Sequence, residues 1–242
     1  MAQIFTLNTC FDAWHAVSNM LLINNSGDNL LIEILDPCNY IELDDWIARY
    51  SPNLVTNQNK DQINNIINTI FPYKLASRVE DREDLYNRYI SIYRRSRRMH
   101  NQKWGTYFER LIEFPNSNRL GTTQNQLENA ITALNGNSNS KHYITFHLTA
   151  ANIESNIRPI GAPCWQFGEI SKNNNSLDLI AVYRNHDYFH KAFGNYIGLS
   201  KLLQYICEQT DYEPGKLVIH STHAYYNSTT SKFRRLINGG PI

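Results

Sequence analysis

The chain has 242 residues, of which 42% are hydrophobic and 12% aromatic, and its formal net charge is +1. This length and composition suit a globular protein with a sizeable core, and we expect a single domain over residues 1–242. The balanced charge argues against nucleic acid or an acidic membrane surface as a partner. Apolar runs such as residues 30–35 are too short to span a bilayer, so we expect no membrane attachment.

The four cysteines are spaced widely and irregularly, without a Cys-x-x-Cys pair; they are Cys10, Cys38, Cys164 and Cys207. That spacing is untypical of a zinc ribbon or a disulfide framework. No histidine motif for a metal is present either, so no metal site is predicted. Residues 1–5 lack the basic region of a secretion signal. We therefore expect reduced thiols in a cytoplasmic protein, which leaves a thiol available for chemistry.

The periodicity of apolar residues predicts the main elements in chain order. Helical spacing is found at residues 11–22, 62–71, 85–98, 126–134 and 196–207. Strand character is found at 30–35, 143–148, 177–183 and 216–220, and residues 168–183 are typical of a hairpin. Asn-rich or Pro-Gly turns are predicted at 24–27, 135–139, 173–175 and 213–215. Long helices mixed with strands that do not alternate regularly indicate an α+β fold.

The segment from Pro163 to Asn195 concentrates residues that bear chemistry. Cys164 follows a proline at the start of a predicted strand, and its thiolate could add to an electron-poor carbon such as C6 of a pyrimidine ring. Arg184 could lower the pKa of that thiol and bind a phosphate in bidentate fashion. The alternative is a buried apolar cysteine, with Asp187 and Asn195 acting as turn and cap residues before the next helix.

The order and spacing of these motifs resemble the thymidylate synthase family over residues 125–227. The matching features are Pro-Cys, Gln-Phe, a hairpin, Tyr-Arg-x-x-Asp, Asn before a helix, Pro-Gly before a strand, and His-x-Tyr. The resemblance implies an α+β fold with a mixed β-sheet flanked by helices, and a homodimer formed through the sheet. It also implies one-carbon transfer to a pyrimidine nucleotide, with 5,10-methylenetetrahydrofolate as the cofactor.

The resemblance assigns a role to each matching residue. Cys164 would be the nucleophile, and Gln166 would lie behind it. Arg184 would bind the nucleotide phosphate, and Asn185 replaces the serine that follows this arginine in the family.

Other matching residues would bind the remaining parts of the ligands. Asp187 would order water and the folate ring. Asn195 would bond to the O4 and N3 edge of the pyrimidine. Because asparagine at this position goes with uracil in the family, a uracil nucleotide is favoured. His223 and Tyr225 would hold the sugar 3′-hydroxyl.

Several positions depart from the family pattern. The loop at residues 24–29 lacks the expected phosphate arginine, and Lys141 and His142 stand where paired arginines reach across the dimer. Thr69 falls near the position of a proton-relay glutamate. Trp104 replaces the tyrosine of a Tyr-Gly pair, and nearby Tyr107 is the candidate to compensate.

The basic run at residues 94–98 fits either a phosphate or folate-tail contact or a solvated helix end. Only residues 226–242 follow the His-x-Tyr pair, fewer than in typical synthases.

Two functions therefore remain open. One is an enzyme that adds a methyl or hydroxymethyl group to C5 through a covalent bond between Cys164 and C6. The other is a nucleotide-binding homologue that acts as a sensor or partner subunit.

Overall fold

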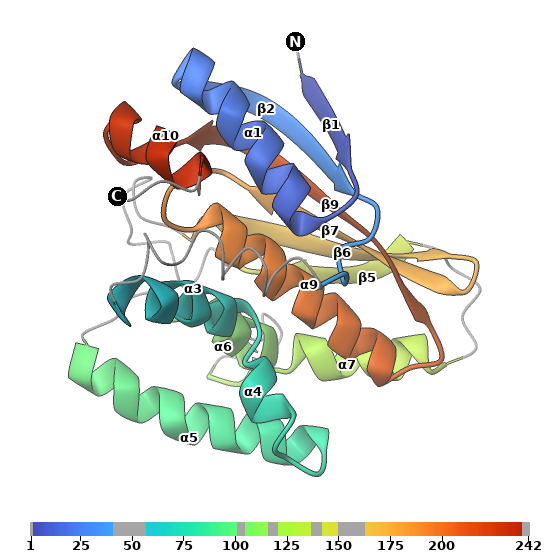
Figure 1. The fold of residues 1–242 in the computed structure, drawn as a ribbon. Helices are drawn as coiled ribbons and strands as arrows, with labels where there is room; N and C mark the ends of the chain where they lie inside the picture. Colours follow the sequence, from blue (N-terminus) through green and yellow to red (C-terminus); the bar gives the residue numbers. More distant parts are fainter. Residues whose placement is uncertain are drawn as a thin grey trace.

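The computed structural model describes residues 2–40, 57–100, 105–115, 121–136, 142–149 and 163–238. For residues 57–62, 94–100 and 142–143 the backbone alone is described. These parts form a mixed β-sheet with helices packed against it (Figure 1), which confirms the predicted α+β class.

The central sheet has the strand order β1-β2-β9-β7-β6-β5, and the short strand β8 extends one side of β9. The pairs β1–β2, β7–β9 and β8–β9 are parallel, whereas β2–β9, β6–β7 and β5–β6 are antiparallel. The strands of this sheet are β1 (Gln3–Leu7), β2 (Ser26–Ile34), β5 (His142–His147), β6 (Trp165–Asn173), β7 (Ser176–Tyr183), β8 (His186–Asp187) and β9 (Glu213–Tyr225). A separate two-stranded pair joins β3 (Phe114–Pro115) to β4 (Thr123–Gln124).

The helices are α1 (Cys10–Asn24), α3 (Asn57–Ile70), α4 (Tyr73–Ala76), α5 (Arg82–His100), α6 (Tyr107–Ile112), α7 (Gln126–Leu134), α9 (Ala192–Glu208) and α10 (Thr230–Ile237). Their ends follow local capping chemistry. Thr9 and Asp12 form a reciprocal capping box at the start of α1, and Thr106 caps α6 by accepting from the Glu109 amide. Asn25 ends α1 with a φ of 64°, a conformation that asparagine tolerates.

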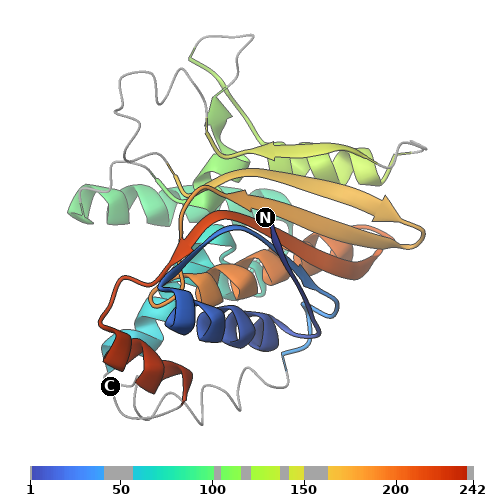
Figure 2. The same ribbon diagram turned by 90° about the horizontal axis from the view of Figure 1, so that it is seen from above.

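One face of the sheet is buried under helices and the other is more open. Buried and half-buried residues alternate along the whole of β7, as they do along most of β9. The buried set faces α1 and α9, which cross the sheet on the same side in both ribbon views (Figures 1 and 2). This side carries the core, whose large buried side chains include Trp14, Phe146, Trp165 and Phe233.

Helix α9 is the central helix, and α3 packs directly on it. A Cβ atom at Gly194 would lie 2.8 Å from Cγ2 of Ile66, and one at Gly198 would lie 2.9 Å from Cβ of Ile70. The two glycines therefore allow a close helix–helix approach that a side chain would prevent. The approach places Ile66, near the end of α3, beside the start of α9, where Asn195 lies.

The structure confirms the predicted helices at 11–22, 62–71, 85–98, 126–134 and 196–207 and the predicted strands, and most elements run further than predicted. The turn predicted at 213–215 is wrong, because these residues begin β9. Pro214 is compatible with the strand since it lies beyond the end of β2, whose Ile34 pairs with Leu217. The hairpin turn at 173–175 is confirmed, with Asn174 at a φ of 55°.

Candidate active site

A cavity of about 410 Å³ opens where β6 begins, where β7 ends, and where α9 and α6 start. This volume lies within the range of small-molecule sites. The described residues that line it are Ile66, Thr69, Gly105, Thr106, Tyr107, Arg110, Pro163, Cys164, Arg184, Asn185, His186, Asp187, Lys191, Asn195 and Tyr225.

Cys164 is the only one of the four cysteines on the wall of this cavity. The others are poor nucleophiles, because burial raises the pKa of the Cys10, Cys38 and Cys207 thiols, the last to about 12. All four cysteines are free of disulfides. The cavity therefore singles out Cys164 as the available thiol.

Tyr107 brings a phenol next to this cysteine. Its hydroxyl accepts a hydrogen bond of 3.2 Å from the backbone amide of Trp165, the residue that follows Cys164. Burial raises the pKa of Tyr107 to about 12, and the neighbouring Cys164 acts in the same direction. The phenol therefore keeps its proton at neutral pH.

Arg184 is tied to the peptide that carries the thiol. Its backbone amide donates to the Cys164 carbonyl at 2.9 Å, and its Nε donates to the Pro163 carbonyl at 3.2 Å. The Gln166 side chain also donates to the Pro163 carbonyl. Gln166 is absent from the cavity wall, so its position behind the cysteine suits support of the loop.

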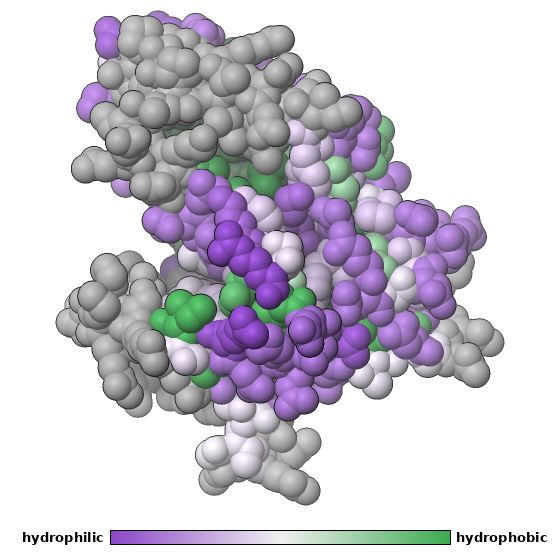
Figure 3. Space-filling view, turned by 60° about the horizontal axis from the view of Figure 1, so that its bottom comes forward, coloured by the Kyte–Doolittle hydropathy of each residue, from purple (hydrophilic) through white to green (hydrophobic). Residues whose placement is uncertain are grey.

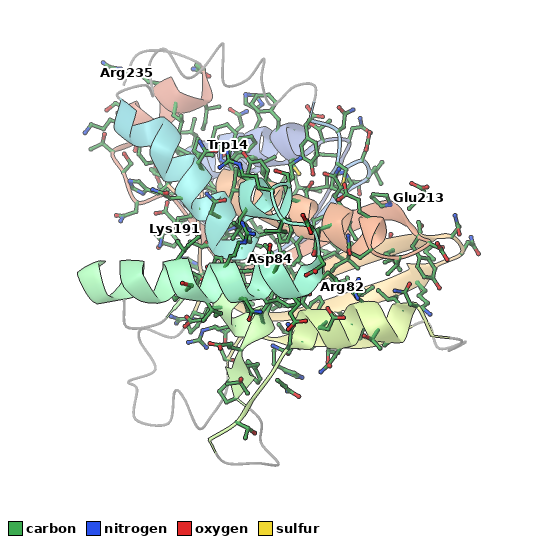
Figure 4. The ribbon with its side chains drawn as sticks, turned by 90° about the horizontal axis from the view of Figure 1, so that it is seen from below. Trp14, Arg82, Asp84, Lys191, Glu213 and Arg235 are labelled. Atoms are coloured by element: carbon green, nitrogen blue, oxygen red, sulfur yellow. The ribbon has the colours of Figure 1, made fainter. Side chains whose placement is uncertain are left out.

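The described part of the cavity wall carries more positive than negative charge. Arg110, Arg184 and Lys191 contribute cations, whereas Asp187 is the one carboxylate among the described lining residues. Arg110 is 6% exposed and donates to the Leu148 carbonyl at 2.6 Å, and Lys191 is exposed at the start of α9 (Figure 4). This balance favours an anionic ligand. The sequence motifs pointed to neither Arg110 nor Lys191.

Asp187 has a structural function in addition to its place on the wall. One carboxylate oxygen accepts from the backbone amides of Phe189, His190 and Asn227, and the other lies 2.9 Å from Nδ1 of His190. Asp187 thus holds the turn between β8 and α9, as the alternative interpretation of the sequence expected.

Asn195 lies at the floor of the cavity and is 5% exposed. Its Nδ2 atom lies 3.2 Å from Nε2 of His186. His186 also lines the cavity, although no sequence motif assigned it a role. Asn185 lies beside it on the wall.

The predicted His-x-Tyr pair is divided between the cavity and the surface. Tyr225 lines the cavity, whereas His223 is absent from its wall. Nδ1 of His223 lies 2.7 Å from the Asp28 carboxylate, and its ring stacks on Tyr225 with centroids 5.7 Å apart. Of these two stacked rings, only that of Tyr225 lines the cavity.

Of the remaining predicted residues, the structure describes some and not others. Thr69 lines the cavity, and its hydroxyl donates to the Ile66 carbonyl at 2.7 Å. Lys141 and Trp104 lie outside the described residues, as do the side chains of His142 and of residues 94–98. Among the residues described, no group of three or more His, Cys, Asp or Glu side chains is placed to hold a metal.

Comparison with known proteins agrees with this geometry. The sequence profile of the family described as "Thymidylate synthase" matches residues 11–238, which is most of the chain. The chain belongs to the thymidylate synthase family. It is also 28% identical over 78 residues to a "Putative thymidylate synthase" from Methanococcoides burtonii, a match that covers 32% of this chain and 36% of that protein.

Membership in the thymidylate synthase family confirms the resemblance drawn from the motifs. The chain matches only about a third of the length of its curated relative. Across the described ranges, no helix is long and apolar enough to cross a membrane.

Proposed function

We propose that the protein transfers a one-carbon unit to C5 of a pyrimidine nucleotide through a covalent bond between Cys164 and C6. The observation that carries the proposal is the convergence of Cys164, Tyr107, Arg184 and Asn195 on one cavity. Tyr107 comes from a segment far from the other three in the chain. Together these residues supply a nucleophile, a phenol, a cation and an amide, which is the set that this chemistry needs.

The walls of the cavity match the parts of a nucleotide. Arg184 and Arg110 supply cations for a phosphate, with Asn185 as an added donor beside them. Asn195 presents an amide that can pair with a pyrimidine edge, and Tyr225 presents a hydroxyl for the sugar. His223 would act on the sugar through its stack with Tyr225.

The chemistry starts with addition of the Cys164 thiolate to C6, which moves an electron pair to C5 and O4 and makes C5 nucleophilic. Arg184 favours the thiolate through its positive charge. Asn195 stabilises the negative charge that develops on O4 by donating to it. After C5 has formed its new bond, its proton must leave. Tyr107 lies beside Cys164 to order a water that accepts this proton, and the electron pair left at C5 breaks the bond between the one-carbon unit and its carrier. Addition of hydride or water to the resulting exocyclic carbon is accompanied by expulsion of the thiolate, which restores the C5–C6 double bond.

Members of the family normally use 5,10-methylenetetrahydrofolate, which supplies the one-carbon unit when bound. The lining fits a flat heteroaromatic ring with a carboxylate-bearing tail. Ile66 would pack on the ring, and Lys191, exposed at the start of α9, would pair with a carboxylate. Whether hydride or water completes the transferred group decides between a methyl and a hydroxymethyl product.

A nucleotide-binding homologue without transfer chemistry is the second candidate. Thr69 stands on the cavity wall where a relay glutamate was expected, and Asp187 already accepts from three backbone amides. A site with so few available carboxylates on the described part of its wall would bind a nucleotide and remove protons slowly. The presence of Cys164 on the wall favours the enzyme.

The open face of the sheet supports a homodimer. Ile4, Leu31, His220, Val182 and Phe167 are neighbours across five strands on the face opposite the helices. Ile4 is 70% exposed and Leu31 is 37% exposed. By contrast, the coloured part of the face in Figure 3 is largely hydrophilic, with hydrophobic residues in small groups. The sheet face is therefore the better candidate for self-association.

The proposal is tested by release of tritium from 5-tritiated pyrimidine nucleotides. We expect release from the deoxyuridine monophosphate in the presence of 5,10-methylenetetrahydrofolate, and none from Cys164→Ala. The deoxycytidine, uridine and cytidine monophosphates test the base and the sugar. Nucleotide binding by calorimetry without release from any substrate would favour the second candidate. The mass of the product separates methyl from hydroxymethyl transfer.

A further inference from the structure

His186 joins the floor of the cavity to the core of the protein. The residue is 1% exposed on β8, and its ring stacks in parallel on Tyr183 with centroids 4.3 Å apart. Its Nδ1 lies 2.8 Å from Oγ of Ser221, and its Nε2 lies 3.2 Å from Nδ2 of Asn195. Both ring nitrogens therefore have a buried hydrogen-bond partner, and one of these partners faces the cavity.

The hydrogen bonds continue away from the cavity into the core. The Ser221 side chain also bonds to the hydroxyl of Tyr188, which in turn bonds to the hydroxyl of Tyr196. Tyr188 and Tyr196 are 1% and 0% exposed. The result is a buried chain, named here the His186 chain, of Tyr196, Tyr188, Ser221, His186 and Asn195.

The atoms of the His186 chain set the direction of its hydrogen bonds. Burial lowers the pKa of His186 to about 3, so the ring is neutral and carries one proton. An amide nitrogen only donates, so Nε2 must accept from Asn195 and the proton must lie on Nδ1. Nδ1 then donates to Ser221. The hydroxyl of Ser221 in turn donates its hydrogen bond to the hydroxyl of Tyr188. Burial raises the pKa of Tyr188, and the bond from Ser221 lowers it, as expected for a bond in which the tyrosine oxygen accepts.

The direction of these hydrogen bonds matters because the side-chain amide of Asn195 can rotate by 180°, which exchanges its oxygen and its nitrogen. With one Nδ2 hydrogen of Asn195 given to His186, the other hydrogen and Oδ1 stand side by side as a donor and an acceptor. Such a pair complements O4 and N3–H of uracil. If Nε2 carried the proton, it would donate to Oδ1, the amide would turn by 180°, and the donor and acceptor would exchange places. The exchanged pair complements N4–H and N3 of cytosine.

We propose that His186 is a specificity-positioning residue, which holds the Asn195 amide in one orientation and so makes the site selective for one pyrimidine base. The inference rests on the proposed function, which assigns the held orientation to uracil. Selectivity follows because the wrong base leaves a buried donor facing a donor and an acceptor facing an acceptor. Asn195 contacts the base, and the hydrogen bonds of the His186 chain set the orientation of the Asn195 amide.

The first test is the tautomer of His186 in the wild-type protein, read from the ¹⁵N chemical shifts of its ring. We expect a protonated Nδ1 and an unprotonated Nε2. A proton on Nε2 would overturn the inference, whatever the protein binds.

The second test compares binding of the monophosphates of deoxyuridine and deoxycytidine by calorimetry. Tyr188→Phe removes the acceptor for Ser221, which can then donate to Nδ1 and move the proton to Nε2. We expect the wild-type preference for deoxyuridine monophosphate to fall by about tenfold or more in this variant, as the loss of one buried hydrogen-bond match predicts. Ser221→Ala, which breaks the same chain, is the second variant.

Tyr183→Phe is the matched control. It removes a buried hydroxyl that has no hydrogen-bond partner among the described residues, and it keeps the ring that stacks on His186. Its base preference should equal that of the wild type. An equal preference in wild type, Tyr188→Phe and Ser221→Ala would overturn the inference alone. Absence of binding of either nucleotide to the wild type would overturn the proposed function, and with it this use of the His186 chain.

Discussion

Replacing Tyr107 with phenylalanine removes the phenol beside Cys164 and leaves the aromatic ring in place. The hydroxyl is buried, and burial raises its pKa to about 12, so it is a neutral donor that also accepts from the Trp165 amide at 3.2 Å. Loss of a positioned group of this kind slows proton transfer by about 10² to 10⁴. That range corresponds to about 3 to 5 kcal/mol in the activation barrier.

The same substitution leaves the Trp165 amide without its acceptor, which costs about 1 to 3 kcal/mol of stability when such a group stays buried. Release of tritium from the C5 position measures the first effect, and urea unfolding measures the second. We expect kcat to fall by at least about a hundredfold, whereas KM for the nucleotide changes little because the phosphate ligands remain.

Tyr86→Phe is the control for this prediction. It removes a hydroxyl that donates to the Glu128 carboxylate at 3.0 Å, and Tyr86 is absent from the cavity wall. Stability should fall and tritium release should stay unchanged. If Tyr107→Phe behaves in the same way as Tyr86→Phe, the phenol serves only the structure and the assigned role is wrong.

Three further predictions concern packing, an ion pair and pH. Gly198→Ala should lower the free energy of unfolding by about 1 to 3 kcal/mol, because a Cβ there would lie 2.9 Å from Ile70; an unchanged urea midpoint would contradict this. Arg82, which is labelled in Figure 4, pairs in bidentate fashion with Glu128 and so joins α5 to α7. Arg82→Ala should therefore cost about 1 kcal/mol, more than Arg88→Ala, which removes an exposed pair with Asp84. Equal losses in these two variants would be the contrary result. Burial lowers the pKa of His186 from 6.5 to about 3 in the folded protein. Between these pH values the unfolded chain binds a proton at His186 and the folded protein does not. Its contribution to stability is therefore full above pH 6.5 and is lost as the pH falls, by up to about 1.4 kcal/mol per pH unit. His186→Gln should flatten the pH profile of urea unfolding in this window, and an unchanged slope would refute the buried neutral state.

Most of the fold followed from periodicity, because the helices and strands bury one face each. The prediction at residues 213–215 failed because Pro-Gly usually marks a turn. Here Pro214 lies beyond the end of β2, where a missing amide hydrogen costs no strand pairing. Such a position is a property of strand register, which local sequence does not contain.

The candidate site was predictable where an ordered set of motifs carries it. Cys164, Arg184 and Asn195 lie on one cavity wall as expected. Arg110 and Lys191 could not be predicted, since lone cations in helical segments resemble a solvated surface until the fold places them.

His186 was missed for a related reason. Its importance comes from Ser221 and Asn195, which lie 35 and 9 residues away in the chain. A buried histidine with two partners has no local signature, because burial and hydrogen bonding are set by tertiary contacts.

The central claim is that Cys164 forms a covalent bond to C6 of a pyrimidine nucleotide. It is tested most directly by the mass of the protein after incubation with 5-fluorodeoxyuridine monophosphate and 5,10-methylenetetrahydrofolate. Fluorine at C5 cannot leave as a cation, so the adduct should persist. We predict a mass increase that includes the nucleotide, mapped to the peptide containing Cys164 and absent in Cys164→Ala. An unmodified protein under conditions where calorimetry shows the nucleotide bound would contradict the claim.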